Sequence, residues 1–451
     1  MPFEITQDLI EQVQNLIVQH DNEGLLELLA NEHHADIAEL IDELDLEEAT
    51  YIIKLLDSEL TSEVLMEIDD DVREKILRNL SVQEIAEELL ELDTDDAADM
   101  IAELPENRQE SVISAIEDEE HVKDIVELLK YDENSAGGLM AKELVKVNEN
   151  WNVLKCVREM RAQAEFVTRV HSIYVVDDDG KLKGRLSLKD LLVTSTKTHI
   201  SEIYIPKVDF VNVHDKAEDV ARIMQKYDLE AIPVVDENQH LLGRITIDDI
   251  VDVLKEEADK DYQMAAGISQ DVEADDTIWQ LTRARLPWLI LALFGSFISV
   301  YILTGFGNIM NDPKVRSLFF FTPLIAAMAG NVGVQSSAIV VQGLANDNIK
   351  GSLWKRLLKE VGLTLFNGIL LSIIIFIFGE VMSYDITFSI TISISLIAVI
   401  ILASVIGTFV PIFLNNRGID PALATGPFIT TSNDIFGIFT FFYIAKLILG
   451  F

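Results

Sequence analysis

The sequence contains, at residues 425–442, the segment Thr425-Gly-Pro-Phe-Ile-Thr-Thr-Ser-Asn-Asp434-Ile-Phe-Gly-Ile-Phe-Thr-Phe-Phe442. The segment is apolar and of membrane-spanning length, with one carboxylate in its middle. An ionisable group at the centre of a membrane helix costs about 2.5–3.5 kcal/mol, so it is retained mainly where it faces water, a partner or an ion. Thr430, Thr431 and Asn433 precede Asp434, and we expect these polar groups to line a pore. The alternative is a buried Asp434 bonded to Ser or Thr of a neighbouring helix.

The C-terminal half of the chain contains five apolar stretches. Each is as long as the ~20 residues that a bilayer requires, or longer. The predicted spans are 284–306, 317–344, 354–381, 387–414 and 420–447. The sequence therefore predicts a five-helix transmembrane domain.

Basic residues near the ends of these spans predict the orientation. One side of the membrane would carry Arg283, Arg285, Lys350, Lys355, Arg356, Lys359 and Arg417. The other side has Lys314 and Arg316 in one loop, a partial exception, and only acidic residues in the next. Because basic loops stay in the cytoplasm, we expect a cytoplasmic N-terminal half and an external C-terminus.

Charge divides the chain into two unlike parts. Residues 1–280 hold 25 Lys and Arg against 69 Asp and Glu, whereas residues 281–451 hold 10 against 7. Such acidity disfavours nucleic acid and anionic lipid as partners and suggests cations, although an acidic surface can also serve solubility alone. The single cysteine, Cys156, excludes an internal disulfide. The N-terminus lacks the pattern of a cleaved signal peptide.

The first segment repeats with a period of twelve residues. The apolar positions in register are Leu44, Leu56, Ile68, Leu80, Leu92, Leu104 and Ile116. The residues that follow them are Asp45, Asp57, Asp69, Ser81, Asp93, Pro105 and Glu117, which are mostly residues that start helices, with the Pro in a first turn. We therefore predict a solenoid of short helices over residues 25–130, a surface suited to protein binding or regulation.

After Ser135-Ala-Gly-Gly-Leu-Met140, which we interpret as a linker, two strands around an Asp-Gly turn lead into a helix, and the pattern returns 59 residues later. The tandem repeat resembles the paired cystathionine-β-synthase (CBS) domains, whose signature appears as Gly184, Ser187 and Asp190 and again as Gly243, Thr246 and Asp249. In that family the hydroxyl and the Asp can bind an adenine nucleotide. Thr246 and Asp249 are the better candidates here, although many CBS pairs are packing modules only.

Carboxylates recur at helical spacing after the second repeat. On a helix, Asp249, Asp252, Glu256 and Asp259 would form one stripe. Like charges so close repel unless they are solvated or bridged by a divalent ion. The segment is thus either a solvated linker helix or an element that responds to cations, and its place between the CBS pair and the membrane favours the second interpretation.

The second span contains Pro323-Leu-Ile-Ala-Ala-Met-Ala-Gly-Asn331-Val-Gly-Val-Gln335, in which Asn331 and Gln335 could line water or bond between helices. This motif, the Gly-Pro-Phe-Ile-Thr-Thr-Ser-Asn-Asp434 motif, the Ala-Gly-Gly-Leu-Met segment and the CBS pair occur in one order. Over nearly its whole length the chain resembles the MgtE-type magnesium transporters.

That resemblance implies a multidomain membrane protein and a homodimer whose pore is lined by the second and fifth spans, with Asp434 of each subunit holding hydrated Mg²⁺. It also implies a cytosolic magnesium sensor that closes the pore. The matching regulatory positions are Asp95, Asp99, Asp249, Asp252, Glu257 and Asp261. Lys255 and Lys260 interrupt this acidic run. ATP is a possible regulatory ligand.

The predicted domains are an acidic helical domain (1–134), two CBS domains (135–200 and 201–255), a plug helix (256–282) and the transmembrane domain (283–451). Mg²⁺ suits a lone carboxylate because it keeps several waters. All eight histidines and the cysteine precede residue 281, which disfavours zinc and copper in the membrane part. No phosphate-binding loop motif of an ATPase is present. We predict a magnesium-gated magnesium channel and no enzyme. The alternatives are a CBS-regulated channel for another ion and a membrane cation sensor that does not transport.

Overall fold

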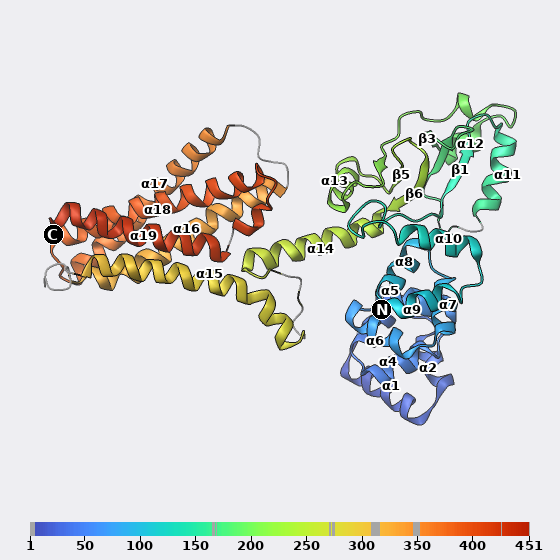
Figure 1. Cartoon of the computed structure of the whole chain (residues 1–451), viewed down its shortest axis with the longest axis horizontal. Coiled ribbons are helices and arrows are strands. Elements are labelled where there is room, and N and C mark those ends of the chain that lie inside the picture. Colours follow the sequence, from blue (N-terminus) through green and yellow to red (C-terminus); the bar gives the residue numbers. More distant parts are fainter. Residues whose placement is uncertain are drawn as a thin grey trace. The chain divides into compact units, whose positions relative to one another are not determined.

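The computed structural model describes residues 5–164, 167, 169–269, 272, 276–307, 316–345, 352–424 and 426–450. The chain folds as two compact units, Met1–Lys255 and Glu256–Phe451 (Figure 1). Each unit has its own buried apolar clusters. The multidomain architecture that the sequence predicts is confirmed.

Ten short helices form the N-terminal part of the first unit. They are α1 (Gln7–Gln19), α2 (Asn22–Leu29), α3 (His34–Asp42), α4 (Leu46–Ile53), α5 (Ser58–Glu67), α6 (Asp70–Asn79), α7 (Val82–Leu89), α8 (Thr94–Ala102), α9 (Glu106–Ile113) and α10 (Glu119–Leu128). The apolar positions of the twelve-residue period pack into one core. The predicted solenoid is therefore present (Figure 1).

The residues that follow the apolar positions start the helices, as expected, with two exceptions. Asp45 and Ser81 form capping boxes, and Asp57 accepts from the backbone of Leu60. Pro105, however, is itself the N-cap of α9 and not a first-turn residue, and α10 is capped by Asp118 in place of Glu117. The second exception has a simple cause, because Asp118 accepts two backbone N–H groups of α10.

The CBS part contains two three-stranded sheets of the same topology. The elements of the first repeat are β1 (Val145–Asn148), α11 (Val153–Gln163), β2 (Ile173–Val176), β3 (Leu182–Leu186) and α12 (Leu188–Val193). Those of the second are β4 (Val211–Asn212), α13 (Ala217–Tyr227), β5 (Ala231–Val235), β6 (Leu241–Thr246) and α14 (Ile247–Ala266), and a short 3₁₀ helix, η2 (Ile200–Glu202), lies between the repeats. In each sheet the first pair of strands is parallel and the second antiparallel.

The segment before β1 is not the simple linker that its two glycines suggested. Ala136 and Met140 are fully buried. Ala141 exchanges two backbone hydrogen bonds of 2.9 Å with Arg244 on β6. A Cβ on Gly137 would overlap Tyr131 and Val213, so the glycines permit close packing and do not supply flexibility. The segment thus joins the helical domain to the second CBS sheet.

Helix α14 begins inside the second CBS repeat and continues into the second unit. It starts nine residues before the predicted plug helix and ends at Ala266, followed by Gly267 with φ of +83°. A Cβ on Gly267 would overlap Pro427, and one on Gly426 would overlap the carbonyl oxygen of Ala265. The end of α14 therefore lies directly against the start of the last membrane helix.

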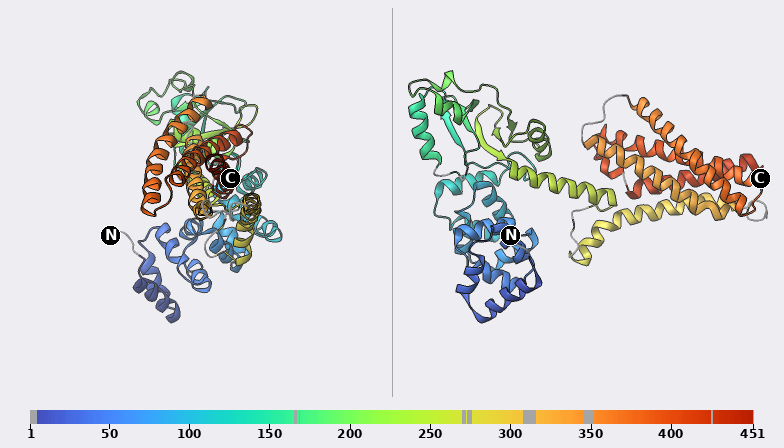
Figure 2. Two further views of the ribbon diagram at one scale, coloured as in Figure 1. Left: turned by 90° about the vertical axis from the view of Figure 1, so that its left-hand side faces the viewer. Right: turned by 180° about the vertical axis from the view of Figure 1, so that it is seen from behind.

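The described residues of the second unit form five helices long and apolar enough to cross a membrane, as predicted. They are α15 (Ile278–Gly305), α16 (Leu318–Ala345), α17 (Leu353–Val381), α18 (Ile386–Asn415) and α19 (Gly426–Leu449), with a short 3₁₀ helix, η4 (Pro421–Ala424), before the last. Figure 2 shows them side by side, and α18 contacts α16, α17 and α19.

Two boundaries of these spans differ from the prediction. Thr277 and Gln280 form a capping box that starts α15 early, so Arg283 and Arg285 lie inside the helix and not before it. The last span begins at Gly426 because η4 precedes it. Of the basic residues used to predict the orientation, Lys314 and Lys350 lie outside the described residues.

Candidate functional site

The start of α8 meets the CBS pair in a cluster of acidic residues, which we call the acidic junction. Its members are Asp93, Thr94, Asp95, Asp96, Glu143, Arg244 and Asp249. The backbone N–H and the hydroxyl of Thr94 donate to Glu143 Oε2 at 3.2 and 2.9 Å. The backbone N–H of Lys142 donates to Thr94 Oγ1 at 2.9 Å. These bonds join the helical domain to the segment that leads into β1.

Three carboxylates of the acidic junction are placed to share a metal ion. One oxygen from each of Asp93, Asp95 and Glu143 lies within 4.8 Å of the others. Asp95 is only 8 % exposed. An all-oxygen donor set with several carboxylates fits Mg²⁺ or Ca²⁺ and does not fit zinc or copper.

Burial raises the pKa of the carboxyls at and beside this junction. Desolvation is the largest cause throughout, and it raises the pKa of Asp96 to about 7 and that of Asp249 to about 6. The pKa of Asp95 rises well above its usual range, because of burial first and then the charges of Asp96 and Asp249. The structure therefore brings the predicted residues Asp95 and Asp249 together, in a place where ionised carboxylates repel and a divalent ion would relieve the repulsion.

The CBS signature residues differ between the two repeats. Asp249 Oδ2 accepts two bonds of 2.9 Å, from the backbone N–H and from the hydroxyl of Thr246. In the first repeat, Ser187 Oγ accepts a bond of 3.5 Å from the backbone N–H of Asp190. The predicted nucleotide-binding pair, Thr246 and Asp249, is thus held together by its own hydrogen bonds, and Thr246 is buried.

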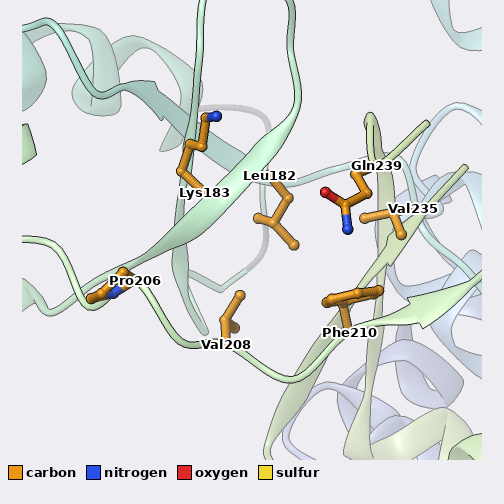
Figure 3. A pocket seen from close by; sticks show the side chains of 7 residues that line it. All are labelled: Leu182, Lys183, Pro206, Val208, Phe210, Val235 and Gln239. Carbon is orange, nitrogen blue, oxygen red and sulfur yellow. The ribbon is translucent and has the colours of Figure 1, made fainter.

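A cavity of about 200 Å³ lies where the two CBS repeats meet (Figure 3). It is lined by Leu182, Lys183, Pro206, Val208, Phe210, Val235 and Gln239. Its volume is below the ~300–1,000 Å³ of typical small-molecule pockets, and Thr246 and Asp249 do not line it. The cavity and the signature residues therefore do not form a single nucleotide site.

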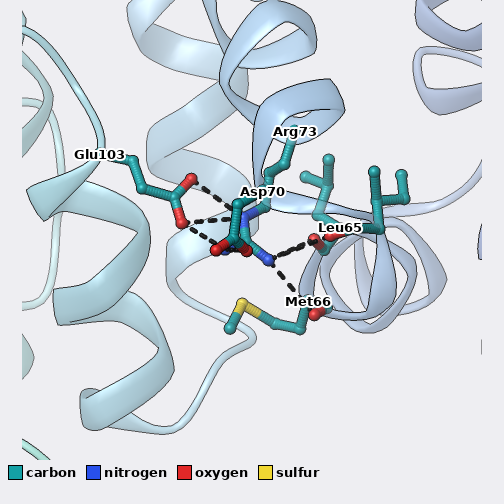
Figure 4. A network of polar contacts seen from close by, with 6 residues as sticks. Leu65, Met66, Asp70, Arg73 and Glu103 are labelled. Atoms are coloured by element: carbon teal, nitrogen blue, oxygen red, sulfur yellow. Dashed lines mark hydrogen bonds and ion pairs between the residues drawn. The ribbon is translucent and has the colours of Figure 1, made fainter. Parts of the chain in front are cut away.

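The predicted residue Asp99 lies further along α8, close enough to Arg73 for that charge to act on its carboxyl. Figure 4 shows the polar network around Arg73. Arg73 is buried and bonds the carboxylates of Glu103 and Asp70 and the backbone oxygens of Leu65, Met66 and Ile68. Desolvation raises the pKa of Asp99 to about 7, and the charge of Arg73 opposes that shift. Asp99 is thus close to a fixed cation of the solenoid.

The other predicted regulatory residues lie on α14. Asp252 is exposed, and burial of its carboxyl raises its pKa. Glu257 and Asp261 belong to the second unit. Glu257 Oε1 forms an ion pair of 2.9 Å with Lys260 Nζ, and the charge of Asp420, before η4, also acts on Lys260. Lys260 thus already neutralises Glu257, one of the predicted regulatory carboxylates.

In the membrane unit, α16, α18 and α19 meet at what we call the glycine crossing, made by Gly333, Gly407 and Asn433. A Cβ on Gly333 would overlap the Asn433 side chain, and one on Gly407 would overlap the carbonyl oxygen of Gly333. Asn433 is 1 % exposed. Its two side-chain polar atoms have no hydrogen-bond partner in the described part of the chain. The structure thus places Asn433 inside the helix packing of one chain, whereas the sequence suggested a lining residue.

The remaining pore candidates are more accessible. Asp434, Thr430 and Thr431 are partly buried on α19, and Thr430 Oγ1 donates to the carbonyl oxygen of Gly426 at 2.5 Å. Asn331 and Gln335 are exposed on α16, four residues apart and therefore on one face. An exposed polar face on a membrane helix points to water or to a partner helix.

Sequence reasoning gave no functional role to Asp93, Asp96, Glu143 or Arg244. The sequence marks Asp93 only as a helix start, and Arg244 follows the signature glycine Gly243 without a role of its own. The run Asp93-Thr-Asp-Asp96 has three carboxylates at one helix start, a density that could have marked it. Nothing local in the sequence indicates that Glu143 and Arg244 lie beside it.

Five membrane-length helices behind a CBS pair, with a carboxylate within the last helix, define an integral membrane protein of the ion-transporting class. Residues 322–444 match the family described as a divalent cation transporter, residues 32–134 match the MgtE intracellular N domain, and residues 136–195 and 200–256 match CBS domains. The chain belongs to the MgtE family, which consists of transporters and not of enzymes.

Relatives cover most of the chain. A protein of Thermus thermophilus named magnesium transporter MgtE is 32 % identical over 98 % of both chains. One of the same name from Enterococcus faecalis is 34 % identical over 73 % of this chain and 72 % of its own.

Solved structures similar to the first unit include two that concern magnesium transport. One is the cytosolic domain of the Mg²⁺ channel MgtE in complex with ATP, with 35 % identity, a TM-score of 0.51 and coverage of 54 % of this chain and 99 % of that chain. The other is the soluble part of a magnesium transporter, with 29 % identity, a TM-score of 0.50 and coverage of 56 % and 99 %.

Proposed function

We propose that this protein is a magnesium-gated magnesium channel of the cell membrane that works as a homodimer. Asp434 carries the proposal, because it is a partly buried carboxylate within the last membrane helix. Mg²⁺ keeps most of its waters and is held by one or two carboxylates. One Asp434 from each copy, with Asn331, Gln335, Thr430 and Thr431 nearby along the same two helices, would supply such a site.

The acidic junction is the proposed sensor. Asp93, Asp95 and Glu143 would hold a magnesium ion there, with Asp249 adjoining. When magnesium is scarce the ionised carboxylates repel, and when it is abundant the ion neutralises them and holds the helical domain to the second CBS repeat. Asp99, Asp252, Glu257 and Asp261 extend the sensor along α8 and α14.

Helix α14 is suited to carry this response to the pore. Its first turn carries Asp249, a member of the acidic junction, and its end packs against the start of α19 through Gly267 and Gly426. A continuous helix can transmit displacement between the two places. We infer that closure acts on the first turn of α19, eight residues before Asp434.

The proposed orientation places the first unit and the start of α19 in the cytoplasm and the C-terminus outside, because the basic residues Lys355, Arg356, Lys359 and Arg417 would then be cytoplasmic. ATP is the proposed second regulatory ligand of the CBS pair. The ATP complex of the homologous cytosolic domain supports it, whereas the Thr246–Asp249 pair, whose members bond each other, does not.

Magnesium flux into proteoliposomes tests the proposal. Asp434→Ala should reduce flux by at least about a hundredfold, because an intramembrane carboxylate at a cation site has no substitute. Glu380→Ala, which removes an exposed carboxylate at the end of α17, is the matched control and should retain flux. Magnesium on the cytoplasmic face should suppress wild-type flux.

Each other result is informative. Undiminished flux in Asp434→Ala would remove Asp434 from the pore. Absence of flux in every variant, with magnesium still altering hydrogen exchange of α8, would favour a sensor that does not transport. Chloride currents that ignore magnesium would support a channel for another ion.

A further inference from the structure

Arg244 is the one cation within the acidic junction as defined above. It lies on β6 and is 6 % exposed. Its Nη2 lies 3.1 Å from Asp93 Oδ2, and its Nε donates to the backbone oxygen of Glu143. Arg244 therefore contacts two of the three residues whose carboxylates could share a metal ion.

The internal repeat provides a natural comparison for Arg244. Arg185 occupies the same place in the first CBS repeat, directly after the signature glycine and 59 residues earlier. Its backbone pairs with Ile205, as that of Arg244 pairs with Ala141. Arg185 is exposed, however. The same strand position thus carries a solvated arginine in one repeat and a buried, ion-paired arginine in the other.

At the start of α8 the Asp93 carboxylate pairs with Arg244 and does not cap its own helix. Asp93 is the N-cap residue of α8 but makes no side-chain cap bond. Asp45, Asp57 and Ser81 cap their helices through their side chains, whereas Asp69, like Asp93, makes no such bond. At α8 the backbone N–H of Thr94 bonds to Glu143, and the Asp93 carboxylate is directed to Arg244.

We propose that Arg244 is a positioning residue that limits how far the helical domain separates from the second CBS repeat when magnesium is absent, because it binds the Asp93 carboxylate that the ion would otherwise neutralise. A guanidinium remains charged at every physiological pH, so it provides a constant attraction against which the acidic groups repel. This inference rests on the proposed function, in which the acidic junction is the magnesium sensor. The Arg244–Asp93 ion pair then limits the separation of the helical domain from the second CBS repeat.

Hydrogen exchange of the full-length protein in lipid nanodiscs tests this role. The reporters are the amides of Thr94 and Lys142, whose hydrogen bonds cross the acidic junction. In magnesium-free buffer, Arg244→Gln should accelerate their exchange by more than about tenfold, because removing one member of a buried ion pair leaves the other uncompensated. Saturating MgCl₂ should return it to the wild-type rate. Arg185→Gln is the matched control and should exchange like the wild type in both buffers.

Arg244→Lys separates charge from folding. If β5 and β6 also exchange faster in Arg244→Gln, the lysine variant, which keeps the charge, should restore protection of Thr94 and Lys142. Failure of lysine to restore it, or wild-type exchange of Arg244→Gln without magnesium, would overturn the inference. A different result would contradict the proposed sensing function: magnesium would then fail to slow the exchange of the Thr94 and Lys142 amides in the wild type.

Discussion

The acidic junction and the glycine crossing both bury polar groups, but they do so by opposite means. The junction crowds carboxylates around one guanidinium, so its stability depends on charge and on any cation that enters. The crossing buries the neutral amide of Asn433 against glycine backbone, so its stability depends on shape. An ion can reversibly change the first kind of contact and cannot change the second. In the proposed function, sensing therefore belongs to the first unit, and the membrane unit supplies a fixed frame around Asp434.

The largest effect is expected at the glycine crossing, where the backbone of one membrane helix lies directly against that of another. Gly407→Ala should destabilise the membrane unit by about 1–3 kcal/mol, because the added Cβ would meet the Gly333 carbonyl, which is backbone and cannot move aside. Thermal unfolding in detergent measures this change. Gly362→Ala, on α17 with open space around it, should be neutral or stabilising by up to about 1 kcal/mol. Equal melting temperatures for both variants would contradict a frame fixed by shape.

The next largest effect is expected at the acidic junction, whose stability depends on charge. Asp249→Asn should raise the magnesium concentration that half-protects the Thr94 amide by about tenfold, equivalent to about 1.4 kcal/mol, because one carboxylate of the acidic junction is lost. Exchange measured across a magnesium titration gives the value. Asp190→Asn removes the matching carboxylate of the first repeat and should leave the midpoint unchanged. A shift of the same size in both variants would mean that magnesium acts on the CBS pair as a whole.

The smallest effect is expected at Glu88. It distinguishes the cost of burying a carboxylate from the effect of a bound cation. Burial raises the pKa of Glu88, which lies on α7 outside the acidic junction and accepts a bond from Ser58, to about 7. Since its folded pKa lies above its unfolded value, its contribution to stability is complete below about pH 4.5 and is lost as the pH rises to about 7. At pH 8, Glu88→Gln should therefore stabilise the helical domain by about 1 kcal/mol, allowing for partial solvent screening.

Urea unfolding of the full-length protein, followed by hydrogen exchange of α5 and α7, measures this change at pH 4.5 and pH 8. The control is Glu87→Gln, which alters an exposed neighbour and should have little effect. Added magnesium should not reproduce the stabilisation that Glu88→Gln causes at pH 8. If it did, the acidic surface as a whole, and not the acidic junction, would be the part that binds the cation.

Periodic patterns were the part of the fold that could be predicted. The twelve-residue period gave the solenoid, the 59-residue repeat gave the CBS pair, and hydropathy gave five spans, because each depends on neighbours close in sequence. The same reasoning failed at residues 135–140, where Gly137 serves packing against Tyr131 and not flexibility. It also predicted Asn433 as a pore-lining residue and gave no reason to expect it buried in the packing of the membrane helices.

The sequence by itself determined the class of protein, the order of its domains and the carboxylate within the last membrane helix, because helix periodicity, capping and hydropathy are local properties. Only the tertiary structure decided which acidic residues meet. Thr94 and Glu143 are 49 positions apart in the chain and Asp93 and Arg244 are 151 apart. Such contacts arise when whole domains pack, and two arginines in equivalent repeats therefore differ in burial although their local sequences are alike.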